Sequence, residues 1–240
     1  MHEHPEYQTQ EDFQIRTTKL KEIRDCAVEP YPHKFTPTNT AVQLQQEYHQ
    51  KEVGHSDDAG AGTTPFVRLA GRLILFRSMG KNAFAHLQDE TGRIQLMFNR
   101  DLTQVSGFQG EKSELSPYKF IEKKLDLGDI IGVEGHLFYT QKGELTIFVK
   151  ELTLLCKALL PLADKHGGLA DKELRYRKRW LDLISHPEIC QQFRTRSHII
   201  QEIRAYFHAK EFLEVETPIL QSIYGGAEAR PFQTRLHALD

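Results

Sequence analysis

The chain has 240 residues, 39% of them hydrophobic and 27% charged, which is typical of a soluble globular protein of one large or two ordinary domains. The net charge of −2 excludes a protein that is basic throughout, although local basic patches can still bind nucleic acid. The N-terminus has no basic or apolar signal region, and no apolar run approaches the roughly 20 residues that span a bilayer. We therefore expect neither a signal peptide nor a membrane span.

The cysteines and histidines show no metal-ligand spacing. The three cysteines (Cys26, Cys156 and Cys190) lie far apart and form no Cys-x-x-Cys pair. This pattern favours reduced thiols in a cytoplasmic protein over a disulfide framework or a zinc knuckle. The 12 histidines form no His-Glu-x-x-His motif, so we expect no metal site among them.

Residues 1–64 are predicted to form a helical extension. Apolar residues recur at helical intervals over residues 11–26, which predicts an amphipathic helix, and a second helix is expected near residues 40–51. The following stretch, EVGHSDDAGAGTTP, is small and polar. It predicts a flexible connection or an exposed loop.

Residues 65–156 alternate between apolar and polar side chains and are predicted to be β-structure. Five strands, joined mainly as antiparallel pairs by short turns at residues 90–92 and 141–143, favour a small barrel over a sandwich. A polar insertion at residues 105–120 separates the third strand from the fourth. In the first strand, four apolar residues are predicted to face inward: Val67, Leu69, Leu73 and Leu75.

The second and third strands define an outer face with unusual chemistry. The side chains predicted to point inward are Ala83, Ala85, Leu87, Ile94, Leu96 and Phe98. Those predicted to point outward are Phe84, His86, Gln88, Arg93, Gln95 and Met97. An outward phenylalanine beside polar groups suits stacking of a single-stranded base and hydrogen bonding to its edge.

Two loops extend this face. Residues 77–82 add Arg77 and Lys81, and residues 139–144 add Lys142 and Glu144. Together with the second and third strands, such loops form the nucleic-acid surface of an OB-fold. The alternative is that Phe84 packs under the N-terminal helix and that the cations only form a solvated face.

Residues 157–172, which contain Pro161 and the pair Gly167-Gly168, are predicted to be an inter-domain linker. In residues 173–240, a long helix is expected after Pro187, followed by the β-type segment EFLEVETPIL, which Pro218 ends. The basic run RYRKR at residues 175–179 is either a nucleic-acid patch or an intramolecular element, and we favour the second.

Several long runs resemble the class II lysyl-tRNA synthetases. They are KLKEIRDCAVEPYPHKF, RLAGRLILFRSMGKNAFAHLQDETGRIQLMFNRD, and the stretch from DLGDIIGVEGHLFYT through DKHGGLADKELRYRKRWLDLI. The resemblance covers nearly the whole chain apart from residues 52–63 and 105–120. Aspartyl- and asparaginyl-tRNA synthetases share the OB-fold and the RxRxLDL signature but differ in the linker and in the loop GGAEARPF.

The resemblance implies a fold that is mainly β with flanking helices. It comprises a five-stranded OB-fold barrel over residues 65–156, the linker, and the long helix and first strand (motif 1) of an α+β catalytic domain over residues 173–240. It also implies that the barrel reads the uridine-rich lysine anticodon. Phe84 would stack on an anticodon base, while Arg77, Gln95 and Glu144 would contact base edges. His86 and Lys81 lie nearby, and Lys81 suits a phosphate.

Motif 1 of this family builds a homodimer interface. Phe212, Val215 and Pro218 would lie in it, and Glu211 stands where the family usually has glycine. Gly225, Gly226 and Ala227 match the loop that lines the amino-acid pocket, where glycine lets the backbone approach a ligand. A single strand without its sheet is marginal, so we expect the segment to be disordered, docked on the barrel or sequestered by another copy of the chain.

The family's reaction joins lysine and ATP into lysyl-adenylate and then transfers lysine to tRNA(Lys), with Mg²⁺ as the metal. Motifs 2 and 3, which supply the catalytic arginines and acidic residues, would lie beyond Asp240. We therefore expect no catalytic residue, no bound cofactor and no adenylation by these 240 residues alone. The alternatives are a free-standing tRNA-binding module and a fragment of an aspartyl- or asparaginyl-type enzyme.

Overall fold

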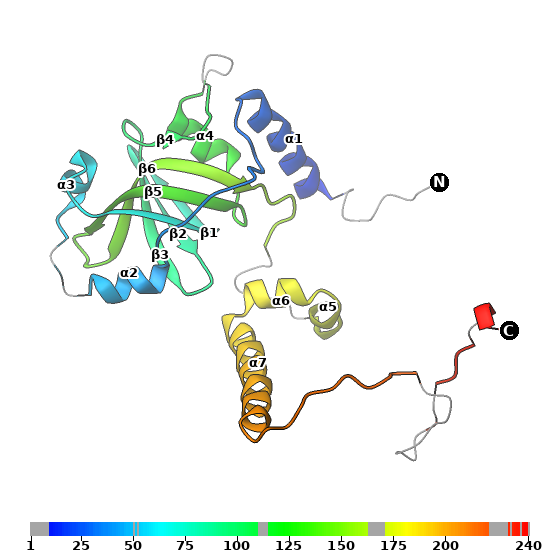
Figure 1. The fold of residues 1–240 in the computed structure, drawn as a ribbon. Helices are drawn as coiled ribbons and strands as arrows, with labels where there is room; N and C mark the ends of the chain where they lie inside the picture. The colour runs from blue at the N-terminus through cyan, green and yellow to red at the C-terminus, as the bar shows by residue number, and fades with distance from the viewer. Residues whose placement is uncertain are drawn as a thin grey trace. The chain divides into compact units, whose positions relative to one another are not determined.

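The computed structural model describes residues 10–49, 51, 53–109, 115–162, 171–220, 230, 232–235 and 237–239. It contains two compact units, residues 1–167 and 168–240, and we describe each by itself. The first unit is a β-barrel with flanking helices, and the second is helical over its first part (Figure 1).

The five predicted strands are confirmed and form a closed barrel. They are β1 (Phe66–Met79), β2 (Asn82–Gln88), β3 (Arg93–Asn99), β5 (Ile130–Tyr139) and β6 (Leu145–Cys156). The sheet order is β3-β2-β1-β5-β6, and a parallel pairing between β3 and β6 closes the barrel. A two-residue strand, β4 (Gln104–Val105), adds to β6 in parallel.

A β-bulge in β1 overturns one prediction. Leu73 lies opposite Leu87, but Leu75 lies opposite His86, so Ile74 is the extra residue. After the bulge, Phe76 and not Leu75 points into the barrel, and the Phe76 ring lies 6.1 Å from that of Phe98 in the core. The predicted inward orientation of Leu75 was therefore wrong, because strict alternation does not reveal an inserted residue.

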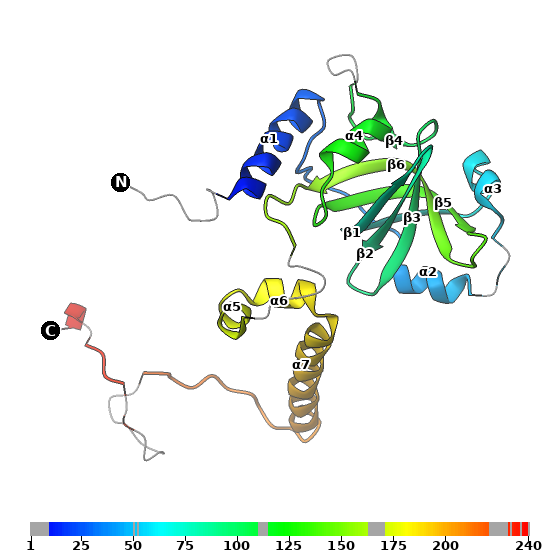
Figure 2. The same ribbon diagram turned by 180° about the vertical axis from the view of Figure 1, so that it is seen from behind.

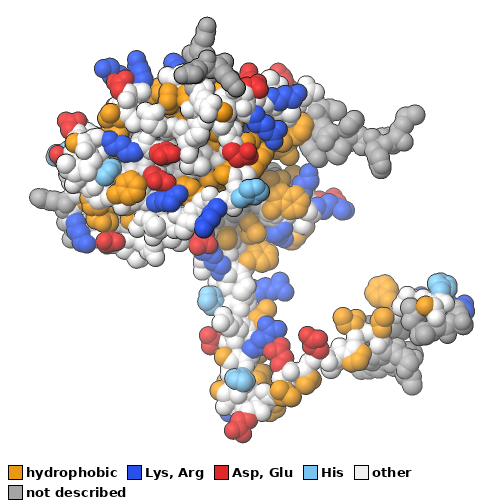
Figure 3. Space-filling model, turned by 45° about the horizontal axis from the view of Figure 1, so that its top comes forward, with side chains coloured by type: hydrophobic (Ala, Val, Ile, Leu, Met, Phe, Trp, Pro, Cys, Tyr) orange, Lys and Arg blue, Asp and Glu red, His pale blue; other side chains and the backbone are white. Residues whose placement is uncertain are grey.

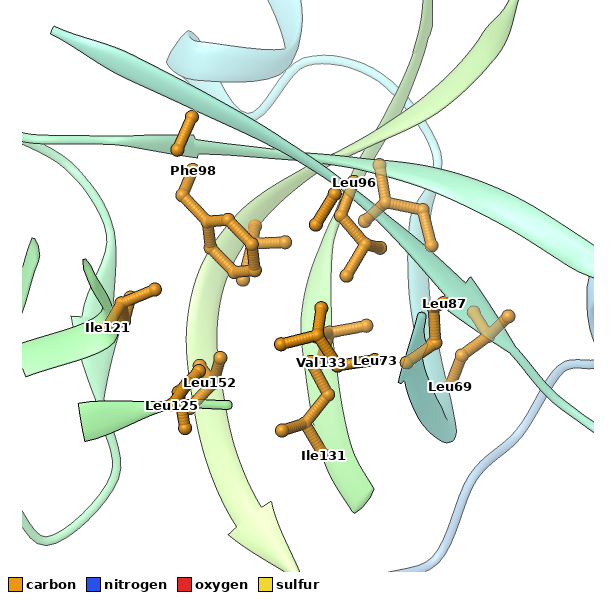
Figure 4. Close-up of a cluster of buried hydrophobic side chains, with 14 of the residues drawn as sticks. Leu69, Leu73, Leu87, Leu96, Phe98, Ile121, Leu125, Ile131, Val133 and Leu152 are labelled. Atoms are coloured by element: carbon orange, nitrogen blue, oxygen red, sulfur yellow. The ribbon is translucent and has the colours of Figure 1, made fainter. Parts of the chain in front are cut away.

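The barrel interior is filled by the side chains that alternation predicted for β2 and β3. Leu87, Leu96 and Phe98 are almost fully buried and meet residues of the other strands in one cluster (Figure 4). Most of the cluster is leucine, isoleucine and valine, which pack densely without leaving polar atoms to satisfy. The predicted inner face of this hairpin is thus confirmed.

The insertion at residues 105–120 is more structured than its polarity predicted. Helix α4 (Pro117–Lys124) begins after Ser116, whose hydroxyl accepts a hydrogen bond from the Lys119 amide, and Pro117 occupies its first turn. Tyr118, Phe120 and Ile121 are buried in the barrel core. Residues 110–114 lie outside the described residues.

Both predicted N-terminal helices are present. Helix α1 (Glu11–Asp25) lies beside α4 at one side of the barrel (Figures 1 and 2). Helix α2 (Ala41–Glu47) begins at a capping box, in which Thr40 accepts from the Gln43 amide and the Gln43 side chain accepts from the Thr40 amide.

Residues 52–65 were expected to form a flexible connection or an exposed loop. This prediction was wrong for the middle of the stretch. Residues Ser56–Ala61 form a short helix, α3, which packs on β5 and β6. Asp58 accepts from the His55 amide, and Gly62 ends the helix in the left-handed conformation with φ of 80°. Ala59 is fully buried because its small side chain lets the helix approach the barrel.

The first residues after β6 are bound tightly to the barrel unit. The Lys157 Nζ atom, fully buried, lies 2.6 Å from an Asp126 oxygen and 2.9 Å from an Asp129 oxygen. Burial raises the pKa of Asp129. Burial would also raise the pKa of Asp126, but hydrogen bonds from Lys157 and Lys19 outweigh it and hold that pKa below its ordinary value. A buried charge cluster therefore anchors the chain as it leaves the barrel.

The second unit contains α5 (Lys172–Arg177), α6 (Arg179–Ser185), α7 (Pro187–His208) and a 3₁₀ turn, η3 (His237–Leu239). The predicted long helix after Pro187 is confirmed. Several of its large apolar side chains are exposed, among them Ile199, Ile203 and Tyr206, and Figure 3 shows some orange side chains between polar and charged ones on this part of the chain. No helix in the described parts of the chain has the length and apolar character needed to cross a membrane.

The predicted strand after α7 is not formed. Residues 212–218 have no regular secondary structure and pair with no other strand among the described residues, and Leu213 and Ile219 are 85% and 98% exposed. The β-type sequence alone does not make a strand, because strand backbone groups need a neighbouring strand for their hydrogen bonds.

Candidate nucleic-acid interface

The strand register brings the predicted site residues of β1, β2 and β3 into two adjacent rows. In the first row, Phe84 lies opposite Arg77 on β1 and opposite Met97 on β3. In the second row, His86 lies opposite Gln95, which in turn pairs with Thr146 on β6. Because directly opposite residues share a face, these rows form one continuous outer surface.

Phe84 is half-buried and rests on an apolar cluster of the outer face. The cluster consists of Ala59, Met97, Phe138 and Phe148. Met97 lies on the outer face, as predicted, but it is only 4% exposed because this cluster, which includes Ala59 of α3, buries it. The alternative interpretation placed Phe84 under the N-terminal helix, but the helix residue in this cluster is Ala59 of α3, and the ring is supported from beneath while part of it stays accessible.

A hydrogen-bonded network surrounds Gln95. Its Nε2 donates to Glu144 Oε2 at 2.7 Å, and its Oε1 accepts from the Thr146 hydroxyl at 2.8 Å. The other carboxylate oxygen of Glu144 lies 3.4 Å from His86 Nε2. The structure thus brings three predicted residues, His86, Gln95 and Glu144, into direct contact.

These three residues border an open groove of about 460 Å³. Its other lining residues are Gln45, His49, Arg93, Ile94, Tyr139, Gly143 and Leu145. The groove therefore joins the barrel face to α2 and to the turn between β5 and β6. A groove of this size, lined by both polar and apolar side chains, suits one nucleobase with its sugar.

Helix α2 is held firmly as one wall of this groove. The Asp89 carboxylate accepts from the Ala41 amide at 2.7 Å and from the Thr91 and Gly92 amides of its own turn. Burial would raise the pKa of Asp89, but these hydrogen bonds outweigh it and lower that pKa. Gln45 Nε2 also donates to the Arg93 carbonyl at 2.7 Å. The wall is thus fixed to the β2–β3 hairpin along its length.

Arg77 and Lys81 lie at the end of the β1–β2 hairpin, where both are exposed. The bulge at Ile74 matters here, because it turns Arg77 to the outer face opposite Phe84. Cations at a hairpin tip can reach a phosphate backbone that passes over the base-contacting face.

The remaining predicted residues lie in the second unit. Gly225, Gly226 and Ala227 fall outside the described residues. Phe212, Val215 and Pro218 are exposed on the extended segment after α7. In the described part of the chain, no three or more His, Cys, Asp or Glu side chains gather where they could hold a metal ion.

The basic run at residues 175–179 is largely paired within its own unit. Arg175 and Arg179 bind the buried Asp182 at 2.8 Å and 2.6 Å, and Arg177 binds Glu173 at 2.8 Å. Burial would raise the pKa of Asp182, but hydrogen bonds from Arg175, Arg179 and His186 lower it. These ion pairs support the intramolecular interpretation of the run.

Sequence analysis missed Thr146 and two further groove-lining residues, Gln45 of α2 and His49, which follows the helix. Thr146 follows the turn that contains Glu144, but only barrel closure brings β6 beside β3 and the hydroxyl beside Gln95. Gln45 and His49 stand on the polar side of a predicted helix, where the sequence holds no signal that they border a groove.

Comparison with known protein families agrees with this geometry. Residues 67–155, which span the barrel strands, match the model of an OB-fold nucleic acid binding domain. Residues 171–240 match the model of the class II tRNA synthetases for D, K and N. The chain therefore resembles the class II tRNA synthetases in its second matched region and an OB-fold nucleic acid binding domain in its first.

Individual relatives point to the lysine branch of these synthetases. A lysine–tRNA ligase of Chlamydia caviae is 59% identical over 234 residues, which cover 98% of this chain and 44% of the relative. One from Chlamydia pneumoniae is 55% identical with the same coverage. One from Lactococcus lactis is 43% identical over 230 residues, 96% of this chain and 44% of the relative. The chain thus spans less than half the length of these relatives.

Proposed function

We propose that this chain is the anticodon-reading part, with motif 1, of a lysine–tRNA ligase that acts in the cytoplasm. The whole protein would activate lysine with ATP and transfer it to tRNA(Lys). The main support for this proposal is the outer face of the barrel. There the Phe84 ring rests on an apolar cluster, beside the hydrogen-bonded pair Gln95 and Glu144 and a groove large enough for a base.

The chemistry of this face suits single-stranded RNA. An aromatic ring with apolar support stacks on a base, which contributes about 1–3 kcal/mol. The Gln95 amide can donate to a base carbonyl, and the Glu144 carboxylate accepts from a base N–H. Arg77 and Lys81 would then contact the backbone or the neighbouring bases.

For the second unit, we propose that the exposed apolar side of α7 and the segment with Phe212, Val215 and Pro218 contribute to a homodimer. The exposed fraction of Phe212 is 62%, and that of Val215 is 66%. Burial of such side chains between subunits contributes roughly 25 cal/mol per Å². Gly225, Gly226 and Ala227 are proposed to line the lysine pocket.

The decisive experiment compares Phe84→Ala with Phe66→Ala in binding a uridine-rich anticodon stem-loop. Phe66 is 57% exposed on β1 and is a matched control outside the proposed site. Phe84→Ala should weaken binding by about 1–3 kcal/mol, as expected for one lost stacking contact, and Phe66→Ala should not. Fluorescence anisotropy at fixed salt measures both, and equal affinities would remove Phe84 from the site.

ATP and Mg²⁺ belong to the proposed reaction of the whole protein, and we assign neither to a described residue of this chain. A polypeptide confined to residues 1–240 should not exchange ATP with pyrophosphate in the presence of lysine. The reason is that adenylation needs cations aimed at the phosphates, which the family places in motifs 2 and 3. Robust lysine-dependent exchange would refute this part of the proposal.

A further inference from the structure

The Thr146 hydroxyl is the only buried member of the network around Gln95. Thr146 stands at the start of β6 and is fully buried, whereas Gln95 is half-buried and the Glu144 side chain is 51% exposed. Its Oγ1 lies 2.8 Å from Gln95 Oε1 and 3.1 Å from the Glu144 carbonyl oxygen. One hydroxyl proton therefore has two acceptors within reach.

The Glu144 carboxylate decides where that proton goes. An ionised carboxylate only accepts hydrogen bonds, so the Gln95 atom that lies 2.7 Å from it must be the Nε2 donor. The opposite end of the amide, which faces Thr146, is then the Oε1 acceptor. Thr146 must donate to it, since two acceptors cannot share a hydrogen bond.

The two ends of the amide are held with unequal firmness. Glu144 belongs to the exposed turn between β5 and β6, whereas Thr146 is part of a paired strand in the closed barrel. The terminal torsion of glutamine has a broad energy profile, so an amide held only by a carboxylate on an exposed turn can swing. The rigid attachment of Gln95 is therefore its bond to Thr146.

We propose that Thr146 is the positioning residue that fixes the Gln95 amide for base recognition. This inference rests on the proposed function. In the fixed orientation, Gln95 keeps one N–H and one oxygen lone pair for a ligand, and Glu144 keeps further acceptor sites beside it. A donor next to an acceptor complements a base edge with a carbonyl beside an imino N–H, as in uracil.

The test measures binding of two stem-loops by the full chain, one with a uridine-rich anticodon loop and one with cytosine in place of those uridines. Thr146→Val should weaken the uridine complex by about 2- to 12-fold, the range for one hydrogen bond, and should reduce the preference over cytosine. Thr146→Ser keeps the hydroxyl and should bind as the parent chain does.

Two controls separate positioning from stability. Thr103→Val removes another buried hydroxyl, which donates to the Val149 carbonyl at 2.7 Å, away from the groove residues, and should leave RNA affinity unchanged. In a Gln95→Ala background, Thr146→Val should cause no further loss, because Thr146 acts through Gln95. A loss that is additive in this double variant would overturn the inference.

The outcomes also separate this inference from the proposed function. A parent chain that does not bind the uridine stem-loop defeats the proposed function and with it the inference. If the parent chain binds the uridine stem-loop, and Thr146→Val and Thr146→Ser have the same affinity and the same preference for uridine over cytosine, only the inference about Thr146 is overturned. If Thr146→Val does not fold, NMR of the parent decides, since the Gln95 side-chain amide should be rigid. Mobility equal to that of the exposed Gln141 amide would overturn the proposal.

Discussion

Strand β2 and residues 211–220 both have the composition of a β-strand, yet only β2 forms one. Each edge of β2 pairs with a neighbour, β1 on one side and β3 on the other. Residues 211–220 have no partner strand among the described residues, and their apolar side chains are exposed. The difference shows that a strand exists only with its neighbours, because its backbone groups cannot bond to one another.

Helix α7 is intermediate between β2 and residues 211–220, because it is formed but its apolar side is exposed. Its backbone hydrogen bonds are satisfied within the helix, so it forms although Ile203 is 52% exposed and Ile199 is 55% exposed. The sequence pattern of an amphipathic helix thus predicts the helix itself but leaves open what covers its apolar side. Four predictions, most with a matched control substitution, test the contrast between the packed barrel and this second unit.

The largest effect is expected for Lys157→Met. The substitution leaves the fully buried Asp129 carboxylate without its cation, which costs about 3–5 kcal/mol in the free energy of unfolding. The control is Arg177→Met in the second unit, which removes the ion pair between Arg177 and Glu173. Because these two side chains are 75% and 70% exposed, the free energy of unfolding should fall by no more than about 0.5 kcal/mol. Urea denaturation followed by circular dichroism measures the free energy of unfolding of both variants. Similar losses in the two would contradict the difference between the packed barrel and the second unit.

A matched pair of apolar truncations comes next. Leu96→Ala opens a cavity in the barrel core, where Leu96 is 0% exposed, and should cost about 2–5 kcal/mol. Ile203→Ala on α7 removes a half-exposed side chain and should cost under about 0.5 kcal/mol at low protein concentration. A large loss for Ile203→Ala that grows with protein concentration would show that another copy covers α7.

Asp89→Asn should change the pH dependence of barrel stability. The pKa of Asp89 is lowered in the folded state, so its contribution is present above the unfolded-state pKa of about 3.9 and is lost as pH falls below it. The variant lacks this titration, and its free energy of unfolding should fall less steeply between about pH 5 and pH 2. Acid titrations in urea measure the slopes, and parallel curves would contradict the role of Asp89.

The smallest effect is expected at the end of α7. The Phe212 amide donates to the Phe207 carbonyl, the Glu211 amide donates to the His208 carbonyl, and Glu211 has φ of 64°. This is a Schellman motif, whose left-handed position glycine adopts without strain. The family's usual glycine thus has a structural reason, and the backbone turn is retained here with Glu211 in its place.

Glu211→Gly should therefore stabilise the last turn of α7 by about 1 kcal/mol or less, whereas Glu211→Ala should not. Hydrogen exchange of the Glu211 and Phe212 amides in the full chain reports this local change. Slower exchange in the glycine variant alone is the expected result, and equal exchange in both variants would argue against backbone strain at this position.

Much of the barrel was predictable from sequence because its signals are local. Alternation placed Leu87, Leu96 and Phe98 inside and Phe84 and Gln95 outside, and the resemblance to lysyl-tRNA synthetases indicated the OB-fold, which the family match confirms. Helical spacing predicted α1 and α7, and Pro187 suited the first turn of α7. The signal for α4 was also local, in Ser116 followed by Pro117, but the polarity of the preceding insertion hid it.

Only the tertiary structure decided the features that depend on contacts between distant residues. The bulge at Ile74 turns Arg77 toward Phe84, the cluster with Ala59 of α3 buries Met97, and the closure of β3 on β6 brings Thr146 to Gln95. None of these has a period or a spacing in the chain, because each arises from the pairing of separate strands or from a helix packed on them. Alternation determines the two faces of each strand, and the closed barrel decides which side chains meet on its outer face.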